Sequence, residues 1–382
     1  MRFRFVRAFF LLGALAAGCA TAPVASVPQQ RLDVHPSIPI AQFSGDPAQI
    51  GAEHGERFRA AINDLYQNYL LVQLQGASLV QARLAAASFE LYMSADYRSE
   101  IQAMAQASGM NVYDAMLAQC FLDLVPAAGC STIALPASAS PDGVARFGRN
   151  LDFDSLNVLD KNSVVIVYHP SGKYRFATIG WPGMIGAVSG MNEYGLCLAN
   201  MEVPRPFRPP MATPYTLLYR TILEQCRDVD EAIELLNRVP RQTANNLMLM
   251  DAAGNRAVAE IRPESVTIRW GRANAALIST NHQRGADADT PGYCWRYDSL
   301  HGESARQMGK IDLQHVEAML ASVVQGNRGD MTLQSMVFEP ANRVVYLATG
   351  SDAPASAYER IDLNYYFRDS GETSVPIAQR SQ

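Results

Sequence analysis

The stretch PAAGCSTIAL, residues 126–135, places a cysteine after small residues and directly before an apolar run typical of a β-strand. Upstream of it, apolar residues recur at spacings of three and four, the period of an amphipathic helix. Downstream, β-branched and aromatic residues dominate runs such as SVVIVYHP at 163–170 and RVVYLAT at 343–349. Cys130 therefore lies where a helical segment ends and a β-rich region begins.

The order of these elements predicts the fold class. Helices are expected at about 78–92, 96–108 and 112–120, all before Cys130. In the β-rich region, helical patterns interrupt the strands at 214–238, with a break near Arg227, and at 312–324. Antiparallel strands with inserted helices favour an α+β layered sandwich over an alternating parallel fold.

The first helix of the upstream segment has a local start signal. Asp46 is suited to the N-cap, Pro47 to the first helical position, and Gln49 to the reciprocal bond of a capping box. Gly51 and Gly55 lie one turn apart on this helix, where the missing side chains let another backbone approach closely.

Composition excludes several classes of function. The chain has 382 residues, of which 48% are hydrophobic, enough to bury a full core. The net charge is −5, and Lys and Arg form no dense cluster beyond the extreme N-terminus, so nucleic-acid binding is not expected. No Cys or His spacing of a zinc site is present, and we expect neither a metal nor another cofactor.

Residues 1–19, MRFRFVRAFFLLGALAAGC, are typical of an export signal. Arginines precede an apolar run that is too short for a spanning helix. The end of this run resembles the bacterial lipobox, in which the cysteine, here Cys19, is lipidated; simple secretion is the alternative. Residues 20–44 are then expected to be a tether. We expect a protein of the bacterial cell envelope, either lipid-anchored (periplasmic or outer-membrane associated) or secreted.

Export also affects the other cysteines, because an oxidising compartment favours disulfides. If Cys19 carries lipid and Cys130 stays free, four cysteines remain, and they allow up to two bridges in three connectivities. The sequence does not choose among these pairings or exclude all of them. The four are Cys120, Cys197, Cys226 and Cys294.

Cys130 has three possible roles: a core residue, half of a disulfide, or a nucleophile. Gly129 leaves the preceding carbonyl sterically open, so that the thiol can attack it in an N-to-S acyl shift. Hydrolysis would then free Cys130 as a new N-terminus. Its α-amine, with a reference pKa of roughly 7.7–8.0, could take the thiol proton without any histidine.

A charged pair follows in FGRNLDFD, residues 147–154. Arg149 near Cys130 would favour the thiolate, and Asp152 could orient the amine or the arginine. The alternative interpretation is an ion pair on the surface of a strand.

GCSTIAL (129–135) followed by GRNLDFD (148–154) resembles the start of the mature catalytic chain in the N-terminal nucleophile hydrolases of the choloylglycine hydrolase and acid ceramidase group. The nearest resemblance is to autoproteolytic acyltransferases similar to isopenicillin N acyltransferase. IGAEHGERFRAAI (50–62) resembles the pro-segment of that family. The resemblance, over about residues 45–350, implies a four-layer αββα sandwich with a helical pro-segment at 45–129 and a catalytic domain at 130–382.

The resemblance also implies further site residues. GMNEYGL (190–196) is similar to the family's GMNExGL hairpin, whose asparagine, here Asn192, helps to form the oxyanion hole. Asn281 in TNH resembles a second oxyanion residue, and Arg296 lies where related enzymes carry an arginine near the nucleophile. The alternatives are an ordinary turn-forming asparagine for Asn192 and a ring-stacked arginine on a helix surface for Arg296.

The expected function is an autoproteolytic amidohydrolase or acyltransferase that acts on small N-acyl amides through a Cys130 thioester. One alternative is a Cys130–His282 protease of papain-like order, although the papain-type sequence around the cysteine is missing. Another is a surface lipoprotein that keeps this fold without its chemistry. His54 is expected to be structural. Four residues could line an apolar acyl site or pack in the core: Trp181, Pro182, Met184 and Ile185.

Overall fold

The computed structural model describes residues 37–74, 79–125, 129–204, 208–285, 293–326 and 330–368. The predicted signal segment, Cys19 and residues 20–36 of the predicted tether lie outside the described residues. Within the described ranges, none of the helices combines the length and the apolar character needed to cross a bilayer.

Helices dominate the chain before Cys130, and strands dominate it afterwards. The helices are α1 (Pro47–Arg57), α2 (Arg59–Leu65), α3 (Leu71–Gln73), α4 (Leu79–Glu90), α5 (Ala95–Ser108), α6 (Val112–Leu124), α7 (Tyr215–Gln225), α8 (Val229–Arg238), α9 (Trp295–Gln307), α10 (Leu313–Ala321) and α11 (Leu363–Tyr366), with a π-helical turn at Tyr66–Leu70. The strands are β1 (Ile40–Gly45), β2 (Cys130–Leu135), β3 (Arg146–Asp154), β4 (Val164–Pro170), β5 (Phe176–Gly180), β6 (Ser189–Asn192), β7 (Cys197–Glu202), β8 (Asn245–Met250), β9 (Arg256–Ile261), β10 (Val266–Trp270), β11 (Leu277–Ser279), β12 (Asp330–Glu339), β13 (Val344–Thr349) and β14 (Glu359–Asp362).

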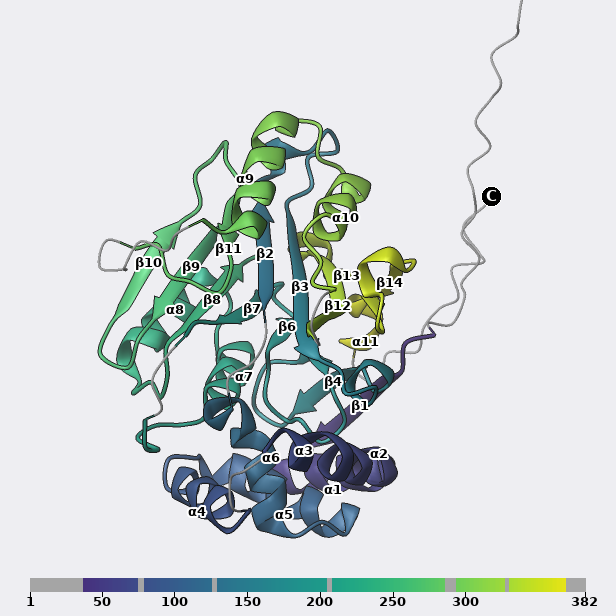
Figure 1. The fold of residues 1–382 in the computed structure, drawn as a ribbon, viewed down its shortest axis with the longest axis vertical. Helices are drawn as coiled ribbons and strands as arrows, with labels where there is room; N and C mark the ends of the chain where they lie inside the picture. Colours follow the sequence, from purple (N-terminus) through teal and green to yellow (C-terminus); the bar gives the residue numbers. More distant parts are fainter. Residues whose placement is uncertain are drawn as a thin grey trace, which may run out of the picture. The chain divides into compact units, whose positions relative to one another are not determined.

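The strands form two sheets (Figure 1). The eight-stranded sheet has the order β1-β4-β5-β6-β7-β8-β9-β10, and the six-stranded sheet has the order β11-β2-β3-β12-β13-β14. Strand β1 runs parallel to β4, and the other pairs are antiparallel. Residues 40–44 were expected in the tether; that boundary is wrong, because their alternating buried side chains and their pairing with β4 make them an edge strand.

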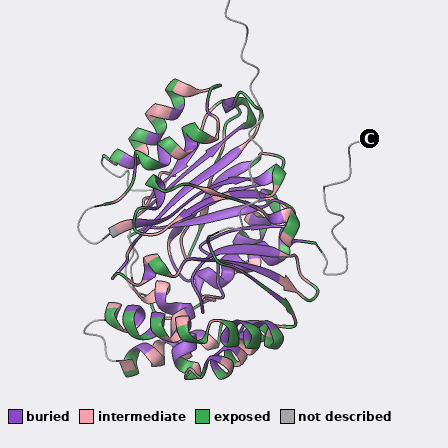
Figure 2. Cartoon of the chain, turned by 90° about the vertical axis from the view of Figure 1, so that its right-hand side faces the viewer, coloured by how far each residue is buried: buried purple, intermediate pink, exposed green. Residues whose placement is uncertain are grey.

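Three apolar clusters define four layers. One lies between the sheets and includes Leu151 and Met248; a second joins the eight-stranded sheet to α7 and α8; a third joins the six-stranded sheet to α9 and α10. Figure 2 shows the consequence, with buried strands and with helices whose outer faces are exposed. The predicted α+β class and αββα layering are therefore confirmed.

The capping box expected at the start of α1 is present. Asp46 Oδ1 accepts a hydrogen bond from Gln49 N at 2.9 Å, and Asp46 N donates to Gln49 Oε1 at 2.9 Å. A Cβ atom on Gly51 would lie 2.1 Å from the Glu100 carbonyl oxygen, so α1 packs on the backbone of α5 at a distance that only glycine permits.

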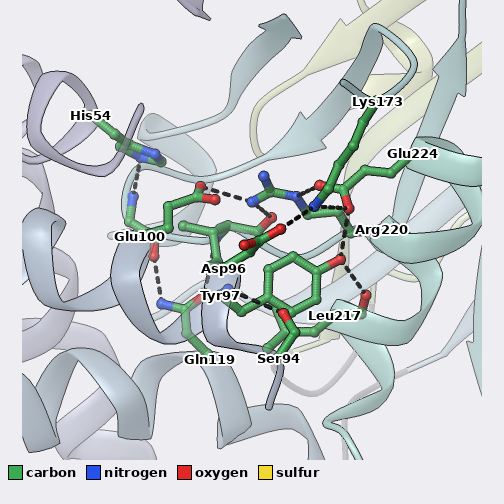
Figure 3. A network of polar contacts seen from close by, with 12 residues as sticks. His54, Ser94, Asp96, Tyr97, Glu100, Gln119, Lys173, Leu217, Arg220 and Glu224 are labelled. Atoms are coloured by element: carbon green, nitrogen blue, oxygen red, sulfur yellow. Dashed lines mark hydrogen bonds and ion pairs between the residues drawn. The ribbon is translucent and has the colours of Figure 1, made fainter. Parts of the chain in front are cut away.

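A buried ionic network joins α5 to α7, as Figure 3 shows. Arg220 of α7, 1% exposed, pairs with Glu100 of α5 at 2.7 Å and with Glu224 at 2.8 Å. The Tyr97 hydroxyl donates to Glu224 at 3.1 Å, and Lys173 approaches the same carboxylate at 2.9 Å. The helices before Cys130 are thus tied to the β-rich region by charges as well as by apolar contacts.

The five cysteines of the described residues are free thiols. None of the disulfides that the sequence left open forms among these residues. Cys130 is the one of these five whose sulfur accepts a hydrogen bond from a buried arginine, Arg149.

Candidate active site

Cys130 is the first residue of β2, and its side chain points between the two sheets. It pairs with Leu151 of β3, belongs to the apolar cluster between the sheets, and is 4% exposed. The Arg149 Nη2 group donates to Cys130 Sγ at 3.7 Å. The thiol is therefore buried and has a cation beside it.

Arg149 is held by the opposite sheet. Its Nη1 group donates to the carbonyl oxygens of Val188 and Asn200, each at 2.9 Å. The side chain is fully buried, which excludes the alternative of a surface ion pair. A buried guanidinium with two backbone acceptors has little freedom to move away from the thiol.

Burial dominates the protonation of Cys130 in the uncleaved chain. It raises the pKa of the thiol to about 11, while Arg149 lowers that pKa and Asp152 raises it. The physical cause is the loss of water around the charged form. The thiol is therefore neutral at physiological pH in this state.

The peptide bond between Gly129 and Cys130 is hydrogen-bonded to the neighbouring strand β3. The Asp152 N–H donates to the Gly129 carbonyl oxygen at 3.0 Å. A Cβ atom at position 129 would lie 3.2 Å from both Asp152 Oδ2 and Arg296 Nη1, which favours glycine here. The Gly129 carbonyl oxygen is hydrogen-bonded in this state, and its openness to attack by the thiol stays a prediction.

Arg296, near the start of α9, contacts three groups around this peptide. Its Nη1 group donates to the Cys130 carbonyl oxygen and lies 3.7 Å from Asp152 Oδ2, and its Nη2 group donates to Asn281 Oδ1 at 3.0 Å. The expectation that Arg296 lies near the nucleophile is met. The alternative of a ring-stacked surface arginine is excluded, because Arg296 is 8% exposed.

Asn281 contacts Cys130, but as an acceptor. Its Oδ1 atom accepts from the Cys130 N–H at 2.7 Å, and its Nδ2 group donates to the Glu202 carbonyl oxygen at 2.8 Å. Asn281 therefore fixes the position of the Cys130 nitrogen.

The expected oxyanion role of Asn192 is wrong. Its Nδ2 group donates to the carbonyl oxygens of Leu223 and Cys226, and its Oδ1 atom accepts from the N–H groups of Tyr194 and Leu196. Alternation along β6 sends the preceding Met191 between the sheets and Asn192 to the α7 side. The alternative of a structural, turn-forming asparagine is correct.

Thr332 was not predicted from the sequence. Its Oγ1 group donates to Asp152 Oδ1 at 2.6 Å from the neighbouring strand β12. No motif marks Thr332, and only the pairing of β12 with β3 brings it to Asp152. The carbonyl oxygens that hold Arg149 and Asn281 carry no sequence signal at all, because every residue has one.

The two histidines considered in the sequence have other partners. His54 of α1 accepts from the Gly183 N–H at 2.9 Å and stacks on Phe43, so its expected structural role is supported. His282 Nε2 lies 3.2 Å from Thr280 Oγ1, whereas the charged group beside Cys130 is Arg149. The geometry gives no support to a Cys130–His282 protease.

An apolar cavity of about 110 Å³ lies between the N-terminal helices and the β-rich region. Its walls include Tyr66 and Tyr69 from the helices and Phe153 from β3. Of the four residues expected at an acyl site, Trp181, Pro182 and Met184 line this cavity. Ile185 does not line it, and its side chain is buried in the core.

Comparison with protein families gives one match over most of the β-rich region. The model of the acyl-coenzyme A:6-aminopenicillanic acid acyl-transferase family matches residues 139–354, which is more than half of the chain. The match includes Arg149 and Arg296 and begins after Cys130. It confirms the resemblance to acyltransferases of the N-terminal nucleophile type.

Two curated relatives come from Dictyostelium discoideum. Protein dcd1A is 26% identical over 235 residues, 53% of this chain and 52% of that protein. Protein dcd1B is 22% identical over 234 residues, 54% of this chain and 47% of that protein. The chain thus spans about half the length of these relatives.

Solved structures with detectable similarity are distant. A mutant conjugated bile acid hydrolase from Clostridium perfringens has 17% identity and a TM-score of 0.46, covering 62% of this chain and 93% of that one. A Caenorhabditis elegans N-acylethanolamine-hydrolyzing acid amidase ortholog has 15% identity and a TM-score of 0.46, covering 61% of this chain and 99% of that one.

Proposed function

Because the chain belongs to the acyl-coenzyme A:6-aminopenicillanic acid acyl-transferase family, we propose that it is a cysteine amidohydrolase or acyltransferase that first cuts its own chain before Cys130. The observation that carries the proposal is the arrangement around one peptide bond. The Cys130 thiol has Arg149 beside it, and the atoms on either side of the Gly129–Cys130 bond are each hydrogen-bonded.

The first step is self-cleavage. The Cys130 sulfur attacks the Gly129 carbonyl carbon, a C–S bond forms, and the C–N bond breaks as the Cys130 nitrogen takes up a proton. Water then hydrolyses the thioester, which releases the Gly129 carboxylate and restores the thiol. The Asp152 N–H, 3.0 Å from the Gly129 oxygen, would stabilise the negative charge that develops there.

The second step is turnover by the freed N-terminal cysteine. The α-amine takes the thiol proton, the thiolate attacks the carbonyl of an N-acyl amide, and the amine returns the proton to the leaving nitrogen. Arg149 supports the thiolate, and Asn281 Oδ1 orients the amine. A thioester at Cys130 then passes its acyl group to water or to an acceptor amine.

The oxyanion of the substrate needs a hydrogen-bond donor other than Asn192. We propose that the Asn281 Nδ2 group serves this role when substrate binds. Its present acceptor, the Glu202 carbonyl oxygen at 2.8 Å, would then be shared or replaced. A side-chain amide in a water-poor site is an effective donor to such a charge.

The substrate proposed is a small N-acyl amide with an apolar acyl group. The cavity of about 110 Å³ is lined mainly by apolar and aromatic side chains, including Phe153. Phe153 is two residues along β3 from Leu151, the pairing partner of Cys130. The acyl group would therefore extend from the sulfur toward the N-terminal helices.

Location is a separate proposal. We propose that residues 1–19 direct export and that Cys19 is lipidated, which would hold the enzyme at the membrane surface of the cell envelope. Mass spectrometry of the N-terminal peptide from membranes tests it: a diacylated Cys19 is expected, and a retained Met1 in soluble protein would contradict it.

Intact mass spectrometry under denaturing, reducing conditions tests the proposed function. The protein lacking residues 1–19 should give two fragments that divide between Gly129 and Cys130, and Cys130→Ala should give a single chain. The wild type should also release amine from N-acyl amides, with a thioester trapped at Cys130. Full turnover by Cys130→Ala would overturn the proposal.

A further inference from the structure

Cys294, His282 and Thr280 form a second cluster that contains a thiol. Thr280 Oγ1 lies 3.7 Å from Cys294 Sγ and 3.2 Å from His282 Nε2. Thr280 and His282 face each other across an isolated β-bridge. The proposed catalytic step uses none of these side chains, although they stand directly beside Asn281 and close to Arg296 in the chain.

The surroundings of Cys294 favour its ionised form. Partial burial by itself would raise the pKa of this thiol, but hydrogen bonds with His282, the Tyr297 N–H and Thr280 outweigh it and lower the pKa to about 6. Cys294 is also the N-cap residue of α9, where the helix dipole stabilises negative charge. This is the reverse of Cys130, whose pKa is about 11.

Charged residues also lie near the Cys294 cluster. Arg284 Nη2 lies 3.4 Å from His282 Nε2, and its guanidinium lies 3.6 Å from the centre of the Tyr297 ring. The acidic residue in the first turn of α9 is Asp298, whose N–H donates to the Cys294 carbonyl oxygen at 2.9 Å. Arg284 therefore holds His282 beside the sulfur from one side, and its cation lies next to the cluster.

Cys294 is also accessible. Its side chain is partly exposed, and its neighbours Tyr293 and Trp295 are 86% and 40% exposed. Cys120 and Cys197, by contrast, are fully buried. An ionised and accessible thiol beside a histidine is the microenvironment of reactive cysteines.

We propose that the Cys294–His282–Thr280 cluster is a redox modification site at which a hydroperoxide oxidises Cys294. The thiolate attacks one peroxide oxygen, an S–O bond forms and the O–O bond breaks. The sulfur loses two electrons and becomes a sulfenic acid, and the departing alkoxide or hydroxide takes a proton from water. A thiol reductant returns the sulfenic acid to the thiol in two steps, through a mixed disulfide.

Oxidation of Cys294 would affect the active site because two active-site residues, Asn281 and Arg296, lie next to the cluster in the chain. Asn281 lies between Thr280 and His282, and Arg296 follows Cys294 by two residues. An added oxygen on the sulfur disturbs the contacts of Thr280 and His282, and with them the positions of the groups that hold the Cys130 nitrogen and carbonyl. The expected effect is a reversible loss of turnover; this part rests on the proposed function, whereas the oxidation itself does not.

The reactivity is tested on the folded Cys130→Ala chain, in which the nucleophile cannot react. Iodoacetamide labelling from about pH 5 to about pH 9, read by peptide mass spectrometry, should modify Cys294 with a half-maximal rate near pH 6. Cys120 and Cys197 are internal controls and should stay unlabelled. His282→Gln should raise the midpoint, and His315→Gln on the exposed face of α10 should leave it unchanged.

A midpoint near the ordinary value of about 8.5, or no labelling of Cys294 in the folded chain, would overturn the proposal. Hydrogen peroxide followed by dimedone should trap a sulfenic acid at Cys294, and its absence would also overturn it. In the wild type, peroxide should reduce turnover and dithiothreitol should restore it, whereas Cys294→Ser should resist peroxide. If no turnover is found at all, the proposed function fails while the labelling result still decides this inference.

Discussion

The Arg149 guanidinium lies 3.7 Å from the Cys130 sulfur and is fixed by two carbonyl oxygens of the opposite sheet. Cys130 and Arg149 lie on the adjacent strands β2 and β3 of the six-stranded sheet. The carbonyl oxygens that accept from Arg149 belong to Asn200 in the eight-stranded sheet and to Val188 just before one of its strands. The site therefore depends on the packing of the two sheets as well as on the residues that react.

Replacing Arg149 tests this dependence. In Arg149→Gln the positive charge beside Cys130 is lost, so the pKa of the thiol should rise, and each unit of that rise lowers the thiolate population about tenfold. We expect kcat/KM for an N-acyl amide to fall by about tenfold or more in protein that remains folded. Arg146→Gln on the same strand, which loses an ion pair with Glu339, is the matched control and should keep its turnover. Equal turnover of Arg149→Gln and the wild type would contradict the assignment.

Thr332 is expected to act by positioning Asp152. Thr332→Val removes a 2.6 Å hydrogen bond to the Asp152 carboxylate, a contact to a charged group worth about 1.5–3 kcal/mol. Self-cleavage, followed as the appearance of two fragments after synthesis is stopped, should slow by about tenfold or more. Thr332→Ser keeps the hydroxyl and should restore most of the rate. If Val and Ser variants cleave at the same rate, the hydroxyl has no positioning role.

The Arg220 network predicts a large change in stability. Arg220→Met leaves Glu100 buried without its cation and Glu224 with Lys173 alone, and breaking a buried pair from one side costs about 3–5 kcal/mol. Urea unfolding should show a corresponding fall in the free energy of unfolding. Arg208→Met breaks an exposed pair with Glu264 and should change it by about 1 kcal/mol or less. Similar losses in the two variants would contradict the network's role in joining α5 to α7.

His54 should make stability fall in acid. Burial, and to a smaller extent Arg220, lowers the pKa of His54 from 6.5 to about 3 in the folded protein. Its contribution is therefore complete above about pH 6.5 and is lost as the pH falls toward 3, because the unfolded chain binds the proton first. Between pH 7.5 and pH 5.0 the expected loss is about 2 kcal/mol by the linkage relation.

The measurement compares urea unfolding at the two pH values in the wild type and in His54→Gln, whose side-chain oxygen can still accept from the Gly183 N–H. The variant should lose less stability in acid than the wild type. His315→Gln, on the exposed face of α10, should behave like the wild type. An unchanged pH dependence in His54→Gln would rule out His54 as the source.

Local sequence determined much of this protein. The capping box of Asp46 and Gln49 and the strand that begins at Cys130 each depend on neighbours within a few residues, so they could be predicted from the chain alone. Gly51 indicated a close backbone approach, but the chain alone did not show that α5 makes it. Arg149 was placed near Cys130 because its motif lies on the strand that follows, whereas Arg296 was placed there only by the resemblance to related enzymes. The helix α9, by contrast, was not predicted, since its start has no side-chain cap.

Only the tertiary structure decided which side chains meet. Asn192 matched a motif, but strand alternation turns it toward α7 and away from Cys130. Thr332 reaches Asp152 through the pairing of β12 with β3, and Cys294 lies beside Thr280 although the two residues are 14 positions apart in the chain. Periodicity in a sequence reports whether a residue is buried, because burial follows from local amphipathicity. It does not report which partner lies across the interface, since that depends on strand order and on the packing of whole sheets.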